Sequence, residues 1–515
     1  MKSVMSHQFS KVPHADIQRS SFDRSHGLKT TFDAGQLVPI FTDEALPGDT
    51  FNLNMSSFAR LATPLHPIMD NMNLDTFFFA VPIRLVWANW HKFNGEQANP
   101  ADSTDYLLPE FSAATWAENS TGDHIGFPTG VSIAPTSIYH RAMHLIWNEW
   151  FRDENLQDSL TVDTGDGPDN PATYATVLTR GKRHDYFTSC LPWPQKGTSV
   201  DIPLGTTAPI VANGPMTGHT ATDPTNRGVI VNTVATAGMH LNGYASAADG
   251  FIFDGGIHAD LTGATAATIN QLRQAFQIQR LYERDARGGT RYTEIIRAHF
   301  GVTSPDQRLQ RPEYLGGGSS NFNVNPIAQT SSTDATSPQG NLAAMGTNSI
   351  QGHGFTKSFT EHCLIIGFAN VRADLTYQQG LERRFSRSTR WDFYWPALAN
   401  IGEQAVLNKE IYTQGTGADD NVFGYQERYA EYRYKPSIIT GAFRSNAATS
   451  LDTWHLSQDF ASLPALNSTF ITDNPPVARV IAVPTEPHIL FDAYFQLNCA
   501  RPMPTYGVPG MIDHF

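Results

Sequence analysis

The chain has 515 residues, of which 40% are hydrophobic and 17% are charged, and its formal net charge at pH 7 is −13. A negative charge of this size excludes strong binding of nucleic acid through the overall electrostatic field, so such contact would need a local basic surface or a basic partner. The three cysteines, Cys190, Cys363 and Cys499, are odd in number and far apart, which argues against a disulfide framework or a zinc site and favours a reducing compartment.

The first 86 residues predict an extended N-terminal arm followed by strands. Residues 1–50 lack helical or strand periodicity and end in the turn signal LPGDT, so we expect an arm there. The start of the chain, MKSVMSHQFS, has no apolar core of the kind a signal peptide carries, so no secretion signal is expected. Residues 51–56 alternate between apolar and polar, as a half-buried strand does. Residues 75–86 are more apolar, and Pro82 predicts an edge strand or a bulge.

Apolar residues at helical spacing predict two amphipathic helices. The first covers residues 137–151, SIYHRAMHLIWNEWF. The second covers residues 268–285, and we expect Leu272, Phe276 and Ile278 to be its buried anchors.

Residues 197–265 differ in composition from the rest of the chain. They are rich in Thr, Ala, Gly and Asn, contain no Lys or Trp, and have Arg227 as their one Lys or Arg residue. Two interpretations stay open, a disordered linker and an ordered surface insertion. Short apolar pieces at 228–234 and 250–256, which could pair as hairpins, favour the insertion. Its candidate contact residues are Arg227, Tyr244, Phe251 and Phe253.

The last third of the chain contains the clearest strand patterns, after a Ser/Thr/Asn/Gly-rich stretch, 319–352, that predicts a loop. Residues 491–499 alternate strictly between apolar and polar, and 363–374 and 431–443 predict further strands. Strands at both ends of the chain with large excursions between them predict a mainly β fold, an antiparallel sandwich with long loop insertions and a few short helices.

No catalytic, cofactor-binding or metal-binding motif is complete, so we expect no enzyme, no cofactor and no metal site. Two arginine clusters are the candidate functional residues. They suit a contact between subunits, where Arg and aromatic residues dominate binding, a surface for single-stranded nucleic acid, or simple salt bridges within the chain. In the first cluster, glycines 288–289 and 316–318 predict bends beside a short helix near Ile295 and Ile296. The clusters are Arg287, Arg291, Arg297, Arg308 and Arg311, and Arg383, Arg384, Arg387 and Arg390.

Long segments spread over nearly the whole chain resemble the major capsid proteins of gokushoviruses, small single-stranded-DNA phages of the microvirus family. The residues at 197–265 share no motif with them, and 321–352 share little. The resemblance is carried by segments such as KRHDYFTSCLPWPQKG (182–197), DARGGTRYTEIIRAHFGV (285–302), VRADLTYQQGLERRFSRSTRWDFYWP (371–396) and ARPMPTYGVPGMIDHF (500–515).

The resemblance implies an eight-stranded jelly-roll subunit of a T=1 icosahedral shell. It implies one capsid domain over 1–515, with an N-terminal arm at 1–50 and an insertion at 197–265 that builds the threefold protrusion. Because the composition of this insertion departs from that of its flanks, we expect it to contact the host. The resemblance further implies no membrane insertion and a place in the virion, with host cytoplasm as the site of assembly. The alternative is a monomeric β-sandwich that binds carbohydrate or another surface. The implied partners are further copies of the chain, an internal scaffolding protein, a minor DNA-pilot protein, a small basic DNA-binding protein, packaged single-stranded DNA and a host cell-surface receptor.

Overall fold

The chain divides into two compact units, and the smaller one is inserted in sequence within the larger. Unit 1 is Met1–Pro194 with Gly288–Phe515, and unit 2 is Gln195–Arg287. The computed structural model describes residues 18–197, 269–306, 308, 310–333 and 338–507, together with the backbone of strands at 210–220, 227–232, 238–241 and 251–259.

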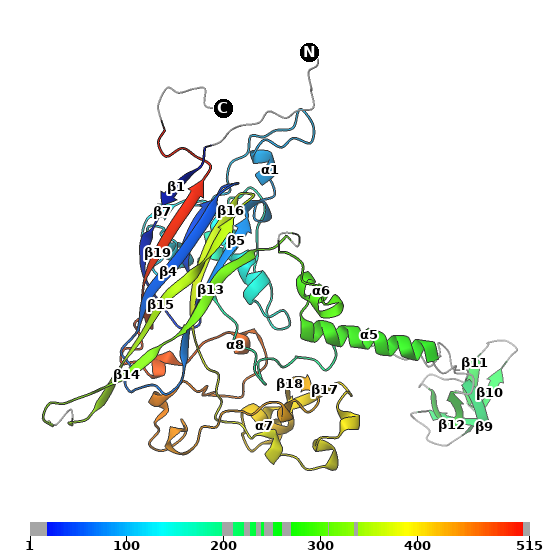
Figure 1. The fold of residues 1–515 in the computed structure, drawn as a ribbon. Helices are drawn as coiled ribbons and strands as arrows, with labels where there is room; N and C mark the ends of the chain where they lie inside the picture. The colour runs from blue at the N-terminus through cyan, green and yellow to red at the C-terminus, as the bar shows by residue number, and fades with distance from the viewer. Residues whose placement is uncertain are drawn as a thin grey trace. The chain divides into compact units, whose positions relative to one another are not determined.

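One sheet of unit 1 is built on the two strands with the clearest alternation in the sequence. Strand β19 (Ile489–Arg501) pairs antiparallel with β4 (Thr50–Leu61), from Ile489 opposite Leu61 to Ala500 opposite Thr50. Figure 1 shows β19, β4 and β15 side by side. The order of this sheet is β1 (Ser20–Asp23), β19, β4, β15 (Leu342–Ser358) and β14 (Asn323–Ala328), and β2 (His26–Phe32) also pairs with β19.

The second sheet is centred on β16 (Cys363–Ala373), in which every residue is buried. Because neighbouring strands flank β16 and both faces of the sheet are covered, its sequence is mostly apolar instead of alternating, and its polar residues Asn370 and Arg372 are hydrogen-bonded within the fold. The order of this sheet is β13 (Glu313–Asn321), β5 (Met72–Pro82), β16, β3 (Gln36–Ala45) and β8 (Leu178–Thr179).

The way the chain alternates between the sheets defines the fold. Eight principal strands lie in the orders β2-β19-β4-β15 and β3-β16-β5-β13, so the last of the eight along the chain, β19, lies between the first, β2, and the third, β4. Two packed antiparallel sheets with this interleaving form a jelly roll. The predicted eight-stranded jelly-roll sandwich is confirmed.

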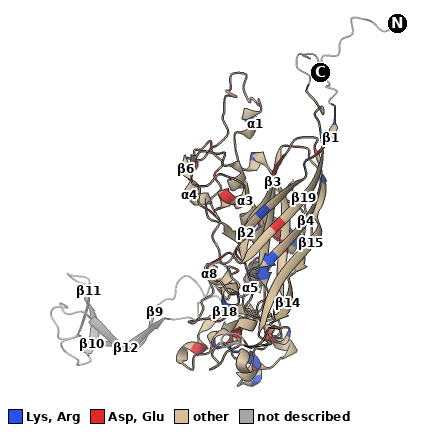
Figure 2. Ribbon diagram, turned by 90° about the vertical axis from the view of Figure 1, so that its left-hand side faces the viewer, with Lys and Arg blue, Asp and Glu red and all other residues tan. Residues whose placement is uncertain are grey.

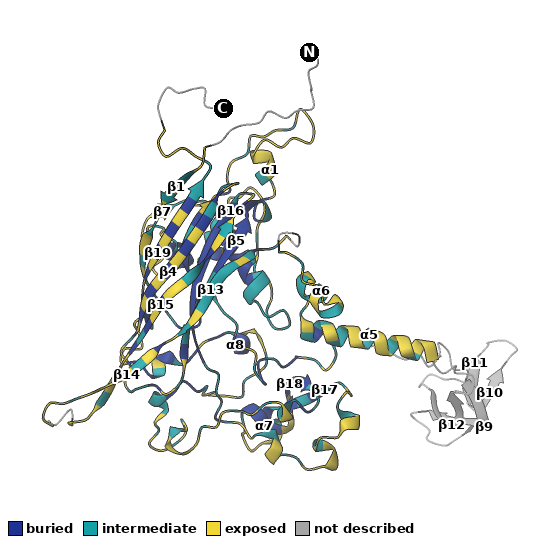
Figure 3. Cartoon of the chain, in the orientation of Figure 1, coloured by how far each residue is buried: buried dark blue, intermediate teal, exposed yellow. Residues whose placement is uncertain are grey.

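Two hydrophobic cores hold the second sheet from both sides. The inner core lies between the sheets, where alternate residues of β4 and β19, such as Phe51, Met55 and Phe495, point inwards. Figure 3 shows this alternation along both strands. The outer core packs Phe79 and Ile366 against α3 (Ile138–Ile146), which continues into a π-helical turn, η2 (Trp147–Phe151). The predicted helix at 137–151 is confirmed.

Short elements connect these layers. Before the insertion they are η1 (Ile83–Leu85), α1 (Trp90–Phe93), β6 (Ala114–Thr115), α2 (Thr121–His124), β7 (Ser132–Ile133) and α4 (Pro171–Tyr174). Between β16 and β19 they are η3 (Arg383–Phe385), η4 (Arg390–Asp392), η5 (Pro396–Leu398), β17 (Glu403–Leu407), α7 (Asn408–Ile411), η6 (Gly417–Asp420), β18 (Val422–Glu427), η7 (Ala430–Tyr432), η8 (Gly441–Phe443), η9 (Asp452–Trp454), α8 (Ser468–Ile471) and η10 (Val477–Arg479).

Unit 2 contains an antiparallel sheet, which favours an ordered insertion over a linker. Its order is β11 (Gly238–Leu241), β10 (Arg227–Asn232), β9 (Ile210–Thr220) and β12 (Phe251–Ala259), so the apolar pieces in β10 and β12 each pair with β9 and not with one another. The predicted second helix is α5 (Ile269–Gly288). The prediction of its buried anchors is wrong for the single chain, since Phe276 is 61% exposed and Leu272 and Ile278 are only half-buried. A helix face becomes buried only where a second element packs on it.

Four local predictions are wrong. Residues 20–45 form β1, β2 and β3 instead of an arm, because they pair with strands hundreds of residues away; residues 1–17 lie outside the described part. Pro82 ends β5, an inner strand, instead of marking an edge. Much of 319–352 pairs as β14 and β15. Residues 431–443 carry two short 3₁₀ turns instead of a strand.

The two glycine groups of the arginine-rich segment serve different purposes. Gly289 has φ +97°, a turn conformation that favours glycine, just before α6 (Tyr292–Phe300), so the predicted bend and helix are confirmed. Glycines 316–318 are not bends but part of β13. A Cβ on Gly316 would lie 2.4 Å from the carbonyl oxygen of Gly354, so the close approach of β15 requires glycine there.

Candidate functional site

Two arginines of the first cluster, Arg291 and Arg311, form ion pairs within the chain. Arg291 Nη1 lies 2.6 Å from Glu154 Oε1, and its Nη2 donates to the carbonyl oxygens of Asn148 and Arg152 at 2.8 and 2.7 Å. Arg311 Nε lies 2.7 Å from Asp306 Oδ1, and its guanidinium stacks over the ring of Trp150. Both guanidinium groups are mostly buried and neutralised, so they hold the start of α6 and the approach to β13 within unit 1.

A carboxyl pair accompanies Arg291. Burial, together with the neighbouring Glu154, raises the pKa of Glu294 to about 7. The pKa of Glu154 moves in the other direction. Burial alone would raise it, but hydrogen bonds from Glu294 and Thr290 lower the pKa of Glu154 to about 2. Two carboxyl groups that share one arginine therefore ionise in separate steps, and near neutral pH Glu294 still holds a proton part of the time.

Two other members of the first cluster are not held in this way. Arg297 on α6 and Arg308 are exposed, and no ion pair to either occurs among the described residues. Arg287, at the end of α5, is half-buried. The cluster therefore contains two kinds of arginine. Arg291 and Arg311 are paired within the chain, whereas Arg297 and Arg308 are exposed to a second molecule.

The second cluster divides in the same manner. Arg383 Nη1 lies 2.9 Å from Glu410 Oε1 and donates to the carbonyl oxygen of Ala405 at 2.7 Å. Arg387 Nη2 lies 3.4 Å from Glu431 Oε1, and its guanidinium is 4.3 Å from the ring centre of Tyr432. Because Glu410 and Glu431 are buried, these two arginines are internal neutralising partners.

The two remaining arginines of the second cluster lie against exposed rings. Arg384 pairs with Glu382 at 2.9 Å and lies 4.6 Å from the ring centre of Phe385. Arg390 lies 5.1 and 4.7 Å from the ring centres of Trp391 and Trp395. Within the described ranges no carboxylate pairs with Arg390. The positive charge of Arg390 interacts instead with the faces of the two indole rings.

Around these arginines, six aromatic side chains form an exposed group that we name the ring surface. Phe385 is the most open, at 67% exposed. Grouped exposed aromatic residues next to arginine are typical of protein contact surfaces. Sequence reasoning found the arginines and the run WDFYW but missed Tyr432, for which the alternation of aromatic and charged residues in 425–434 was the available signal. The ring surface consists of Phe385, Trp391, Phe393, Tyr394, Trp395 and Tyr432.

The candidate host-contact residues lie in the insertion. The backbones of Arg227, Phe251 and Phe253 belong to strands β10 and β12, and their side chains lie outside the described part. Tyr244 lies outside the described residues altogether. Their role stays a prediction.

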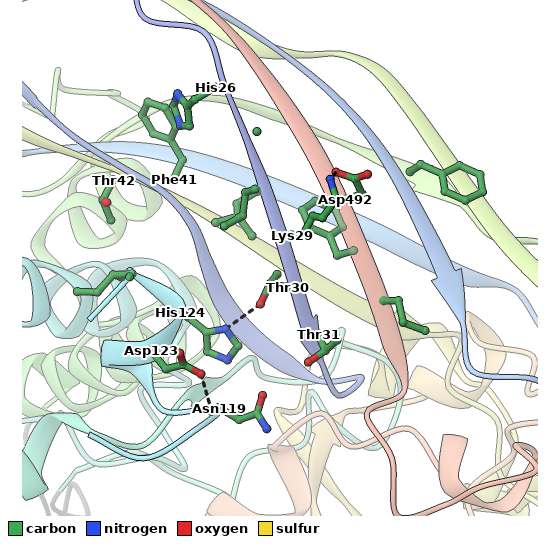
Figure 4. A pocket seen from close by; sticks show the side chains of 18 of the residues that line it. His26, Lys29, Thr30, Thr31, Phe41, Thr42, Asn119, Asp123, His124 and Asp492 are labelled. Atoms are coloured by element: carbon green, nitrogen blue, oxygen red, sulfur yellow. Dashed lines mark hydrogen bonds and ion pairs between the residues drawn. The ribbon is translucent and has the colours of Figure 1, made fainter. Parts of the chain in front are cut away.

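A hollow of about 910 Å³ is lined in part by residues of β2 (Figure 4), and no arginine of either cluster is among its lining residues. His124 Nδ1 lies 3.1 Å from Thr30 Oγ1 in it, and the backbone N–H of Asn119 donates to Asp123 Oδ2 at 2.8 Å. Burial lowers the pKa of His124 and keeps it neutral near pH 7. No pattern in the sequence indicates this hollow, because its walls come from segments far apart in the chain.

Two further properties of the described residues bear on function. They include no group of three or more His, Cys, Asp and Glu side chains that could hold a metal ion. They also include no helix long and apolar enough to cross a membrane.

Comparison with known proteins identifies the family. A family model described as Capsid protein (F protein) matches residues 10–511. Capsid protein VP1 of Bdellovibrio phage phiMH2K is 51% identical, with 99% of this chain and 98% of the relative covered. Capsid protein VP1 of Chlamydia phage 1 is 44% identical over 99% and 98%, and that of Spiroplasma virus 4 is 37% identical over 98% and 97%.

The fold and these relatives agree. A jelly-roll sandwich with neutralised internal arginines and an exposed ring surface fits a subunit that contacts other chains. The relatives are structural proteins of virions, which places this chain in the capsid and outside the enzymes. The chain belongs to the Capsid protein (F protein) family and is a self-assembling structural capsid protein of the gokushovirus type.

Proposed function

We propose that copies of this chain build a T=1 icosahedral shell in which the ring surface forms a contact between neighbouring subunits. The observation that carries this is the exposure of the six rings together with arginines lying on their faces. A closed shell needs contacts between different patches of identical subunits, and aromatic residues with arginine supply most of the binding energy in such contacts.

The charge balance favours a protein partner at the ring surface over nucleic acid. Glu410, Glu431 and Glu382 pair with Arg383, Arg387 and Arg384, so most of the cluster's positive charge is already compensated. Figure 2 shows both basic and acidic residues in the part of unit 1 around β18. A surface that binds polyphosphate needs uncompensated cations, whereas a nearly neutral aromatic surface suits another protein.

Unit 2 is proposed to form the protrusion at the threefold axes and to contact a host cell-surface receptor through Arg227, Tyr244, Phe251 and Phe253. Its support is the change in composition at 197–265 and the separation of Gln195–Arg287 as a compact unit. Exposed loops and insertions on a rigid scaffold often carry recognition.

The remaining proposed partners follow from the family and from the charge of the chain. We propose an internal scaffolding protein during assembly, a minor DNA-pilot protein, and packaged single-stranded DNA neutralised by a small basic protein. The net charge of −13 supports the last of these, because an acidic subunit repels DNA on average. Of the nine predicted arginines, Arg297, Arg308, Arg384 and Arg390 are the ones we propose as contacts with other molecules.

Replacing one exposed ring tests the contact. Phe385→Ala is expected to raise the concentration at which shells form by about tenfold, because a central aromatic residue contributes more than about 1 kcal/mol to a contact. Phe300→Ala is the matched control, since Phe300 is 76% exposed but lies outside the ring surface. Particle formation is followed by light scattering, and thermal unfolding checks that both variants fold. Assembly of Phe385→Ala at the wild-type concentration contradicts the proposal.

Charge reversal distinguishes the subunit contact from a DNA-lining surface. The double variant Arg384→Glu and Arg390→Glu should weaken shell formation and make it sensitive to salt. Electron microscopy gives the yield of particles, and the ratio of absorbance at 260 and 280 nm gives their DNA content. Normal yield with reduced DNA content would show that these arginines face the genome instead.

A further inference from the structure

A cavity of about 700 Å³ in unit 1 is lined by both cationic and aromatic side chains. Its cationic wall comes from residues 152–153 and 180–184, and its aromatic wall from β5, η2 and β13. This volume lies within the range of small-ligand pockets, about 300–1,000 Å³. The cavity shares no residue with the ring surface or with the hollow beside β2.

Lys182 is the most unusual residue of the cationic wall. Its side chain is only 8% exposed, yet no ion pair or hydrogen bond to its Nζ occurs among the described residues. Nζ lies 4.5 Å from the ring centre of Phe470 instead. Burial lowers the pKa of Lys182, opposed by Asp473 and Asp185, both beyond ion-pair distance. A buried ammonium group without a paired anion is costly, and a bound anion would relieve that cost.

Two further cations of this wall lack a carboxylate partner. Arg183 is exposed and has no ion pair within the described ranges. Arg152 Nη1 donates to the carbonyl oxygen of Gln157 at 3.0 Å, while its Nε is buried with no partner. Three cationic side chains, one of them with an unsatisfied buried donor, therefore converge on the same cavity.

The other Arg, Asp and Glu residues that line the cavity are already paired or hydrogen-bonded, whereas the buried Asp473, which adjoins Lys182 beyond ion-pair distance, has no ion pair among the described residues. Arg180 pairs with Asp75 at 2.6 Å, and Arg291 pairs with Glu294 at 3.0 Å. Asp153 Oδ1 accepts hydrogen bonds from the backbone N–H groups of Asn155 and Leu156. The unpaired charge facing the cavity is therefore positive, although the whole chain is acidic.

Aromatic rings also line the cavity, with Arg180 lying over the Phe77 ring and Arg311 over the Trp150 ring. Phe77, Trp150 and Tyr314 are among these lining residues, and Tyr314 is 41% exposed. Aromatic side chains next to cations form the combination that stacks a nucleobase while holding its phosphate. An acidic peptide would use the cations but would leave the Tyr314 ring without a planar partner.

We propose that this cavity binds one nucleotide unit, with the phosphate on Lys182, Arg183 and Arg152 and the base against Tyr314 and Trp150. The same chemistry could be supplied by a free nucleotide or by one unit of a single strand. The site would give the acidic subunit one local point of attachment for a phosphate-bearing ligand. Because it lies apart from the ring surface, the test below and the assembly tests can fail independently.

Calorimetric titration of the purified full-length subunit tests the site with four probes. Thymidine 5′-monophosphate is expected to bind about tenfold or more tightly than thymidine or inorganic phosphate, since only it engages both walls. A short oligothymidylate that competes with the monophosphate indicates a strand as the source, whereas binding of the monophosphate alone indicates a free nucleotide. Both results support the site. Equal binding of phosphate, which would mean an adventitious ion only, overturns it, and so does preference for an oligoglutamate peptide.

Variants locate the binding in the cavity. Lys182→Met keeps the apolar stem on Phe470 and should weaken monophosphate binding about tenfold. Arg183→Gln, at an exposed position where folding is not at stake, should weaken it several-fold and reduce its dependence on salt. Lys29→Met is the control, because Lys29 is exposed and pairs with Asp492 on another face. Unchanged affinity in both Lys182→Met and Arg183→Gln overturns the proposal.

Discussion

His140 is buried among aromatic rings that include Phe111 and Trp116, and neither of its ring nitrogens has a hydrogen-bond partner among the described residues. We expect this histidine to make the fold less stable in acid. Burial, helped by nearby His144, lowers the pKa of His140 to about 3. Below about pH 6.5 His140 takes up a proton in the unfolded chain but stays neutral in the folded chain. The folded state therefore loses stability as the pH falls from 6.5 towards 3.

His140→Phe is expected to reduce that loss. The measurement is the free energy of unfolding in urea at pH 7 and pH 5, for the wild type, for His140→Phe and for the exposed control His91→Phe. The difference between the two pH values should shrink for His140→Phe and stay at the wild-type size for His91→Phe. An unchanged difference for His140→Phe means that another group is responsible.

The carboxyl pair beside Arg291 makes a prediction of opposite sign. The pKa of Glu294 is raised to about 7, so its contribution to stability is fully present below about pH 4.5 and is lost as the pH rises through 7. Glu294→Gln should therefore remove part of the fall in stability between pH 6 and pH 8, measured by thermal unfolding. An equal fall in the variant and the wild type contradicts this reading of the pair.

Single residues show how far sequence reasoning reaches at the candidate site. The arginines were found from their clustering. Their division into internal and exposed groups could not be predicted, because the partners Glu154, Glu410 and Glu431 come from other parts of the fold. The cavity around Lys182 was missed for the same reason.

At the scale of elements, β19 carries a clear test of the core. Phe495 points into the space between the sheets and is fully buried, whereas its neighbour Tyr494 points outwards. Phe495→Ala should lower the free energy of unfolding by about 3–5 kcal/mol, and the control Tyr494→Ala by less than about 1 kcal/mol. Chemical denaturation of the soluble subunit gives both values. Equal effects would contradict the orientation of β19.

The strands that sequence reasoning found are those whose pattern matches their surroundings. Strands β4 and β19 alternate between apolar and polar residues because one face of their sheet is open, whereas most residues of β16 are apolar because both of its faces are covered. Strands β1, β2 and β3 were not predicted from the sequence, because they pair with β16 and β19, which lie more than 300 residues away. The segment 431–443 has the composition of a strand but no neighbour to pair with.

At the scale of the whole molecule, the insertion can be separated from the shell. Deletion of residues 200–262 is expected to leave shell assembly in place and to impair adsorption of the phage to its host. Particle yield by electron microscopy and the rate of adsorption measure the two effects separately. Normal adsorption would refute the role of the insertion in host contact, while a loss of shells would assign it a role in assembly.

The jelly roll and the capsid family were predictable from the sequence, because long segments over nearly all of the chain carry the resemblance. The location of subunit contacts was not, since it depends on which side chains stay exposed after folding. The ring surface could be recognised only from the structure, in which Glu410 and Glu431 pair with Arg383 and Arg387 and leave the six rings exposed.

Electron cryomicroscopy of purified particles tests the central claim most directly. We predict an isometric shell of T=1 symmetry in which Phe385, Trp391 and Phe393 are buried against a neighbouring copy of the chain. A shell in which these rings face solvent or the genome, or a protein that stays monomeric at every concentration, would contradict it.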